Sequence, residues 1–225
     1  MKAWRVAVCA GLVALVGCSG PHHGPPQTVA MPRDGRHSAA LTVVSGAATV
    51  IVGTADLGDS LIRVSTLASS GVRPVLAGRG PVLLYLDPTG QSGPAAVRIV
   101  LNRHVIWRLM FAGGTSLTTV NLGQGRVSSV DFAAGSSVIQ MTLPRPSGTA
   151  LVVLAGGASQ ATLSLPAGVP ARLRLDGGAA SATLAGQTYT GVAGGTVLAA
   201  PGWAGSASRY DIEAPAGVSA ISVAN

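Results

Sequence analysis

The sequence predicts an all-β fold, and three observations support this prediction. An eight-residue segment at 156–163 returns at 177–184, and looser copies begin at residues 113 and 134, so successive copies start 21, 22 and 21 residues apart. A fixed period in this range is typical of stacked repeat architectures. From residue 41 onward, short β-type runs alternate with Gly, Pro, Ser and Asp. The same stretch shows no helical period.

Each repeat holds about two strands. Residues 161–165 place apolar side chains at odd positions and hydroxyls at even positions, which is the two-residue period of a strand with one buried face. The alternation returns at 171–175, with two arginines on the face opposite the leucines. One such unit cannot bury its inner face alone, so successive units must stack. We therefore predict a right-handed parallel β-solenoid of roughly 21-residue repeats, with Leu163 and Leu184 in adjacent layers.

An antiparallel β-sandwich is the alternative fold, because the repeats are poorly defined in residues 41–110. The chain has 225 residues, 48% of them hydrophobic and only 10% charged, which suffices for one packed core and argues against general disorder. We predict a single β domain over residues 41–225. The pattern changes from about residue 194, where a C-terminal cap is expected, with Trp203 and Tyr210 covering the last layer.

The N-terminus predicts export from the cytoplasm. Lys2 and Arg5 precede an apolar run at 6–16, which is too short for a bilayer span of about 20 residues. A basic start followed by a short apolar run is typical of a signal peptide, here residues 1–17. Its removal leaves 13 basic and eight acidic residues, a net charge of +5. The remaining arginines are scattered singly, which argues against a nucleic-acid partner.

Residues 15–18, Leu-Val-Gly-Cys, resemble the bacterial lipobox. The resemblance implies a bacterial lipoprotein that is cleaved after Gly17 and diacylated at Cys18. Two acyl chains anchor a protein stably, whereas one chain is marginal. The only other cysteine, Cys9, is lost with the signal, so no disulfide is expected. We expect a location on the extracytoplasmic face of the cell membrane.

Residues 18–40 are interpreted as a tether between the lipid and the domain. This stretch contains four prolines, which cannot donate ladder hydrogen bonds and which favour an extended backbone. His22 and His23 suggest a metal site, but such a site needs three or four convergent ligands. We therefore predict solvated histidines and no metal or other cofactor.

The C-terminal half resembles bacterial envelope proteins with a toast-rack, or LiaF-type, C-terminal β domain. The resemblance covers about residues 113–225 and rests on glycine-rich corners and two aromatic stretches. These are Gly156-Gly157, Leu165-Pro166, Leu175-Asp176-Gly177-Gly178, Pro201-Gly202-Trp203 and Arg209-Tyr210-Asp211-Ile212. The resemblance implies a non-catalytic β scaffold at the envelope, linked to stress sensing or surface adhesion. Members tied to stress sensing usually carry membrane helices ahead of this domain, whereas this sequence has a predicted lipid anchor there.

Ser60 is a candidate catalytic nucleophile. Residues 58–61, Gly-Asp-Ser-Leu, match the tetrapeptide of the GDSL esterases, in which a histidine with an aspartate three residues before it activates the serine. A serine at its ordinary pKa needs such a base. His104 is the only histidine beyond the segment 1–40, and Leu101 stands three residues before it. Paired acids, Asp56 with Asp59 and Asp211 with Glu213, are a second catalytic option, without an accompanying base or metal motif.

The leading prediction is therefore a protein that is not an enzyme. It would be a lipid-anchored envelope protein that presents a β-solenoid surface to cell-wall components or partner proteins. Arg172 and Arg174, with Thr162 and Ser164, could form a polar ladder for an anionic polymer, or they could simply be a solvated face. The alternatives are an envelope hydrolase at Ser60 and a lipid-carrying lipoprotein, which would need a hollow apolar interior.

Overall fold

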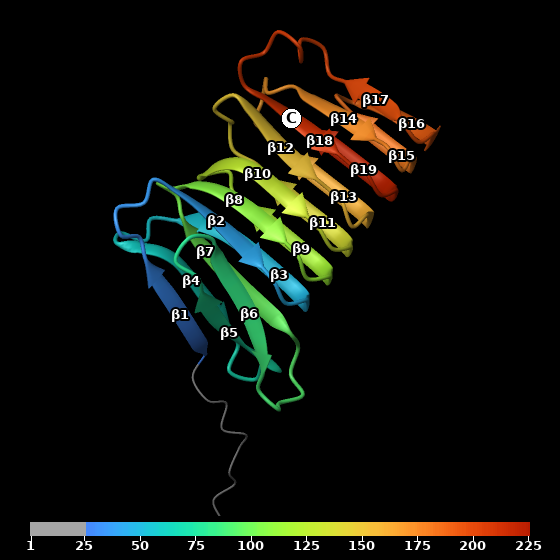
Figure 1. Cartoon of the computed structure of the whole chain (residues 1–225). Coiled ribbons are helices and arrows are strands. Elements are labelled where there is room, and N and C mark those ends of the chain that lie inside the picture. The colour runs from blue at the N-terminus through green and yellow to red at the C-terminus, as the bar shows by residue number, and fades with distance from the viewer. Residues whose placement is uncertain (1–25) are drawn as a thin grey trace, which may run out of the picture.

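The computed structural model describes residues 26–225, which form strands, turns and loops arranged in two mixed β-sheets (Figure 1). The prediction of an all-β fold is confirmed. Within residues 26–225 no helix has the length and apolar character needed to cross a membrane. Both sheets are open, because β1 and β16 are the edges of sheet A and β17 and β5 are the edges of sheet B.

The bounds of the strands follow the spatial order of each sheet. Sheet A consists of β1 (Gln27–Pro32), β4 (Ser60–Thr66), β7 (Ala96–Asn102), β3 (Ala47–Ala55), β9 (Thr115–Asn121), β11 (Ser136–Thr142), β13 (Ala158–Ser164), β19 (Val218–Ala224), β15 (Ala179–Leu184) and β16 (Gln187–Val192). Sheet B consists of β17 (Thr196–Ala199), β14 (Ala171–Leu175), β18 (Arg209–Glu213), β12 (Thr149–Val153), β10 (Arg126–Phe132), β8 (Ile106–Phe111), β2 (Ser38–Val43), β6 (Val82–Pro88) and β5 (Val72–Ala77).

Successive strands pass from one sheet to the other. The pairs β2–β3, β6–β7, β8–β9, β10–β11, β12–β13, β14–β15 and β18–β19 each place their first strand in sheet B and their second in sheet A. Neighbouring pairs are parallel and in register, so that Val138 lies between Leu117 and Gln160. Antiparallel pairing, which the alternative fold predicted throughout, occurs near the ends of the sheets, in β1–β4–β7, β5–β6, β14–β17 and β15–β16.

The C-terminal strands differ from the prediction. β19 lies between β13 and β15, and Leu163 and Leu184 both pair with Val223 instead of with each other. Figure 1 shows the red β18 and β19 between the yellow-orange β12–β13 and the orange β14–β15. The expected cap from about residue 194 is therefore wrong for β18 and β19, which are interior strands. β17 does lie at an edge of its sheet.

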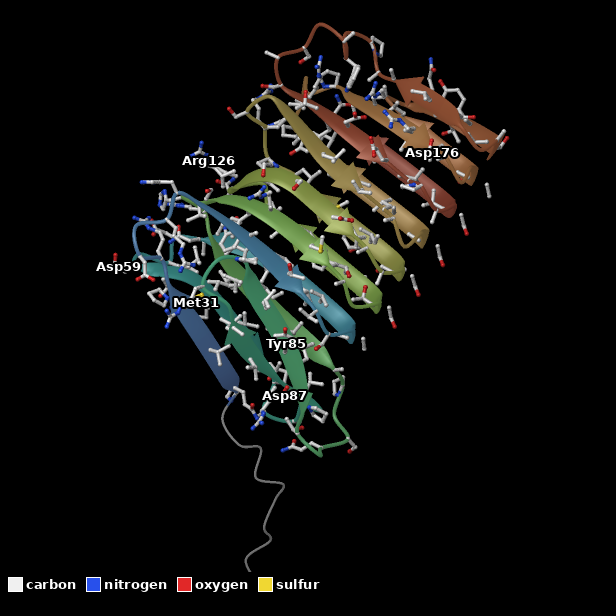
Figure 2. The ribbon with its side chains drawn as sticks, viewed as in Figure 1. Met31, Asp59, Tyr85, Asp87, Arg126 and Asp176 are labelled. Carbon is white, nitrogen blue, oxygen red and sulfur yellow. The ribbon has the colours of Figure 1, made fainter. Side chains whose placement is uncertain are left out.

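The predicted tether is also partly wrong. β1 and the start of β2 fall within residues 18–40, and β1 pairs antiparallel with β4. Val29 and Met31 of β1 pack against the core, and Figure 2 shows Met31 on this strand near Asp59. Alternate residues of β1 are apolar and turned inward, so this segment gains burial that an extended tether would forgo. Because prolines stand at both ends of the segment, the sequence predicted an extended tether instead of this short edge strand.

The core is a narrow layer of side chains between the two sheets. Trp107, Phe111 and Phe132 are almost fully buried, and the two phenylalanine rings stack with their centroids 4.6 Å apart. The Trp107 indole N–H donates to the carbonyl of Asn102 at 3.0 Å. Tyr210 is buried too, and its hydroxyl donates to the Pro144 carbonyl at 2.7 Å. Burial raises the pKa of the Tyr210 phenol above its ordinary value.

Glycines line the corners where the chain crosses from sheet B to sheet A. A Cβ at Gly156 would lie 2.1 Å from the carbonyl carbon of Ala134 and 2.3 Å from the nitrogen of Gly135. A Cβ at Gly177 would lie 2.3 Å from the nitrogen of Gly217. Only a residue without a side chain permits corners of adjacent layers to approach this closely.

Candidate functional site

The strongest candidate site is the outer face of the C-terminal half of sheet A, which we call the hydroxyl face. Residues alternate between inward and outward along β9, β11, β13, β19 and β15, and the outward residues are only partly covered. These outward residues are Leu117, Thr119, Asn121, Val138, Gln140, Thr142, Gln160, Thr162, Ser164, Ser181, Thr183, Ala220, Ser222 and Ala224. Most carry a hydroxyl or an amide, and none of the fourteen is charged.

The central row of the hydroxyl face crosses five strands. The strand register places Thr119 beside Gln140, Gln140 beside Thr162, Thr162 beside Ser222, and Ser222 beside Thr183. Neighbouring strands lie about 4.8 Å apart, so the polar groups recur at nearly that interval across the sheet. The face therefore offers a regular array of groups that both donate and accept hydrogen bonds.

One hollow lies on this face, and a second adjoins it. One, of about 290 Å³, is lined by residues of β9, β11 and β13, including Asn121, Gln140 and Thr162. The other, of about 380 Å³, extends toward β3 and β7, where Ile51 and Arg98 line it. Thr119 and Asn121 border both hollows. The side-chain carbonyl of Asn121 accepts from the Gly123 amide at 3.3 Å, which orients the amide group at their junction.

The chemistry of the hydroxyl face suits hydrogen bonding to a ligand. Hydroxyls and carboxamides at their ordinary pKa values neither supply nor remove protons near neutral pH, and a serine nucleophile needs an adjacent base. The fourteen outward residues, all within the described part of the chain, include no carboxylate, histidine or lysine. A neutral ligand rich in hydroxyl or amide groups would match such a face.

Arg172 and Arg174 lie on the opposite side of the molecule from Thr162 and Ser164. The two arginines are on β14 in sheet B, whereas the two hydroxyls are on β13 in sheet A. The single polar ladder that the sequence suggested is therefore not formed, because consecutive strands turn their outer faces in opposite directions.

Both arginines are paired with acids on the neighbouring strand β18. Arg172 makes a two-point contact with Asp211, and Arg174 lies 3.1 Å from the Glu213 carboxylate. The hydrogen bond to Asp211 raises the pKa of Arg172. Asp211 and Glu213, the predicted catalytic pair, therefore each have a cationic partner on β14.

Trp203 connects this ion pair to the neighbouring loop. Its ring lies between Arg172 and Arg209, whose guanidinium carbons are 4.1 Å and 4.7 Å from the ring centroid. Its indole N–H donates to the Tyr210 carbonyl at 2.8 Å. The Pro-Gly-Trp and Arg-Tyr-Asp-Ile stretches thus meet in a structural cluster, stabilised by cation–π contacts of about 0.5–1 kcal/mol each at such exposed sites.

Ser60 lies at the start of β4, in a corner that also contains Asp56 and His104. The His104 imidazole is 3.1 Å from the Asp56 carboxylate, and Arg103 is 3.2 Å from the same oxygen. Buried Asn102 donates to the Ser60 carbonyl at 2.8 Å, and its own side-chain oxygen accepts from the His104 amide.

The acid beside His104 was not predicted from the sequence. The esterase pattern places an aspartate three residues before the histidine, whereas the fold supplies Asp56 from the β3–β4 loop. The Gly58 amide, then His104, lowers the pKa of the Asp56 carboxyl. Within residues 26–225, no hydrogen bond joins the Ser60 hydroxyl to this imidazole. The contacts of this corner therefore hold the β3–β4 loop in place, and none of them links the Ser60 hydroxyl to the imidazole.

The remaining predicted sites fall outside the described residues. Gly17, Cys18, His22 and His23 all precede residue 26. In residues 26–225, no group of three or more His, Cys, Asp or Glu side chains could hold a metal ion.

Comparison with known proteins shows similarity at the level of the fold. No known protein-family model matches the chain, and no curated protein matches it in sequence. A crystal structure of a proposed cell adhesion protein from Clostridium sporogenes ATCC 15579 superposes with a TM-score of 0.68 at 15% identity, over 88% of this chain and 98% of that one. This similarity shows a shared all-β fold. Membership of the toast-rack, LiaF-type family and of the bacterial lipoproteins stays a prediction.

A proposed adhesin from Bacteroides fragilis NCTC 9343 also matches, over 88% of this chain and 95% of that one. Its TM-score of 0.27 and identity of 8% are too low to support an argument.

Proposed function

We propose that this protein is a non-catalytic, lipid-anchored envelope protein whose hydroxyl face binds a neutral polysaccharide of the cell wall. The single observation that carries the proposal is the uncharged central row from Thr119 to Thr183, repeated from strand to strand on an exposed sheet. The fold shared with a proposed cell adhesion protein is consistent with a surface-binding role. Anchoring through Cys18 would hold the domain at the extracytoplasmic face of the membrane.

A neutral polymer fits this face better than an anionic one. An anionic polymer would require cationic side chains on the hydroxyl face, and its fourteen outward residues include none. Arg172 and Arg174, the arginines of the predicted ladder, are held by Asp211 and Glu213 on the other sheet. Sugar hydroxyls, in contrast, can both accept from and donate to Thr, Ser, Asn and Gln side chains.

The fold has a finer description that belongs to the same proposal. We propose that the stack is a right-handed parallel β-solenoid with repeats of roughly 21 residues. The parallel, in-register pairing of β9, β11 and β13 supports this description. Such stacks create extended faces that suit repetitive ligands.

Binding of the full chain to purified cell walls tests the proposal. The chain is extracted in mild detergent and mixed with walls before and after chemical removal of their anionic polymers. We expect binding to survive both that removal and about 1 M salt, where the Debye length is only about 3 Å. Binding that disappears under either condition would refute a neutral ligand.

A matched pair of variants locates the binding face. Gln140→Glu puts one charge in the middle of the central row, whereas Gln91→Glu makes the same change in an exposed loop after β6. Loss of a donor and addition of a poorly solvated charge should weaken binding about fivefold, equivalent to about 1 kcal/mol. Gln91→Glu should bind like the natural protein. Equal affinities for all three proteins would exclude the hydroxyl face as the site.

The envelope hydrolase is the second candidate, and the pairing of Asp56 with His104 beside the Ser60 loop is the observation in its favour. A serine-reactive phosphonate tests it directly. Labelling of the full chain that is lost in Ser60→Ala would establish a nucleophile there, and absence of labelling would leave the corner with a structural role. The lipid-carrier alternative finds less support, because large side chains such as Trp107, Phe111 and Phe132 fill the space between the sheets.

A further inference from the structure

The middle of the outer face of sheet B carries an isolated carboxylate. Asp131 is on β10, where the burial pattern alternates and Val130 and Phe132 face the core. Its direct neighbours across the sheet are Met110 on β8 and Val153 on β12, and both are apolar. Three residues of β10 pair with both neighbouring strands, Ser129, Val130 and Asp131, and Asp131 is the charged one.

This carboxylate is poorly satisfied. Its Oδ1 atom is shielded from solvent and has no hydrogen-bond partner within the described part of the chain. Burial raises the pKa of the Asp131 carboxyl. A shielded oxygen without a partner is costly. The Asp131 side chain as a whole is only partly covered, so a cation that approaches the carboxylate from the open side of the sheet would offset that cost. On an open sheet face, a cation can reach this carboxylate from a neighbouring molecule as well as from its own chain.

The same face supplies a matching cation. Arg108 is exposed on β8, two residues before Met110, and its register partner on β10 is Ser129. Residues 26–225 provide it with no ion-pair partner. Arg108 is diagonal to Asp131, at about 7–8 Å between Cα atoms, a spacing that a long side chain can bridge. In residues 26–225, however, no ion pair joins these two side chains.

Exposed apolar side chains lie on the same sheet face as this pair of opposite charges. Met110 is 40% exposed and Leu151, the register partner of Ser129, is 36% exposed. Tyr85 on β6, labelled in Figure 2, is 36% exposed on the same sheet. An exposed apolar patch with polar groups at defined positions is typical of a protein interface.

The size of the face suits a stable dimer. β10 is the fifth strand of the nine in sheet B, so the patch is central. Nine strands spaced about 4.8 Å apart and about 20 Å long present roughly 800 Å², and a standard interface buries about that area on each partner.

We propose that a second copy of this chain covers the outer face of sheet B, in a twofold dimer that pairs Arg108 of each copy with Asp131 of the other. A twofold interface brings one patch against itself, so that residue i contacts residue j and residue j contacts residue i. A twofold axis in the plane of the interface, passing between Arg108 and Asp131, forms both ion pairs at once. Both hydroxyl faces then point outward, away from the interface.

Sedimentation equilibrium of the full chain in mild detergent tests this proposal, with charge reversals at the two positions. We expect the natural protein to be a dimer. Arg108→Asp and Asp131→Arg each bring like charges together twice, and each should raise the dissociation constant at least about tenfold. The double variant restores opposite charges and should recover most of the affinity. Arg63→Asp, an exposed arginine on β4 in sheet A, is the matched control and should remain dimeric.

Each outcome decides for or against the pairing. Weakened single variants with a restored double variant support it, and the restoration shows that the single variants had not merely misfolded. A natural protein that stays monomeric at every concentration overturns the proposal. A dimer that neither reversal weakens, or a double variant as weak as the single ones, overturns it as well.

Discussion

The glycine corners make a sharp prediction about stability, and Gly156→Ala tests it best. The new methyl group would lie 2.1 Å from the carbonyl carbon of Ala134, whereas ordinary van der Waals contact begins near 3.4 Å. Backbone atoms cannot rotate away as a flexible side chain can. The corner before β13 must therefore move outward by about 1 Å relative to the corner before β11, and overpacking of this kind typically costs about 1–3 kcal/mol.

The movement also strains hydrogen bonds that hold the two corners together. The Gly156 amide donates to the Phe132 carbonyl at 2.9 Å, and the Ser136 amide donates to the Gly157 carbonyl at 3.2 Å. Each such bond contributes about 0.5–1.5 kcal/mol. Together with the steric term we expect a loss of about 3 kcal/mol, out of a total that is typically about 5–15 kcal/mol.

Urea and thermal unfolding measure this loss. For a domain of this size, about 3 kcal/mol corresponds to a fall in Tm of roughly 6–12 °C. Gly205→Ala is the control, because a Cβ there meets no atom within 4 Å and the backbone conformation is ordinary. That substitution should be neutral or stabilise by up to about 1 kcal/mol. If the two variants unfold within about 1 kcal/mol of each other, the close approach of the corners does not explain the glycines.

Three further predictions concern single groups. Tyr210→Phe should lower the free energy of unfolding by about 1–2 kcal/mol, because the buried Pro144 carbonyl loses its donor; urea unfolding measures this. Asp131→Asn should stabilise the monomer near pH 7 by about 0.5 kcal/mol, since solvent still partly screens the carboxylate. Its pKa is raised by folding, so ionised Asp131 opposes folding above that pKa, and the advantage of the variant should vanish as acid protonates the aspartate. Unfolding of dilute protein across a pH series would show the opposite trend if Asp131 were stabilised by a partner within its own chain. Cys18→Ser should release the protein from membranes into the soluble fraction, and unchanged membrane association after fractionation would refute the anchor.

Local strand patterns were predictable, whereas the order of the strands was not. Alternation at 161–165 and 171–175 identified β13 and β14 correctly, because one buried face imposes a two-residue period. Similar copies at 156–163 and 177–184 suggested adjacent layers. Sequence similarity reports only that both corners suit the same geometry, and the corner at Gly217 suits it equally well.

The candidate site was predictable in its chemistry and not in its location. The hydroxyls of Thr162 and Ser164 were recognised as an outward face, and a ladder shared with Arg172 and Arg174 was one of two interpretations, the other being a solvated face. Parity along a strand states which residues share one face, and it does not state which sheet the strand joins. Asp131 gave no sequence signal at all, because its isolation depends on Met110 and Val153, which are distant in the chain and adjacent in the sheet.

The position of β18 and β19 links the stability of the fold to the proposed binding face. These strands supply Tyr210, Ile212, Ile221 and Val223 to the core, and burial of such side chains contributes about 1.5–3 kcal/mol each. The total of about 6–12 kcal/mol is comparable to the whole stability of a typical domain. Ser222 of β19 also joins Thr162 to Thr183, so the central row is continuous only when the C-terminal strands are inserted. The last residues of the chain therefore complete the core and the hydroxyl face in the same step.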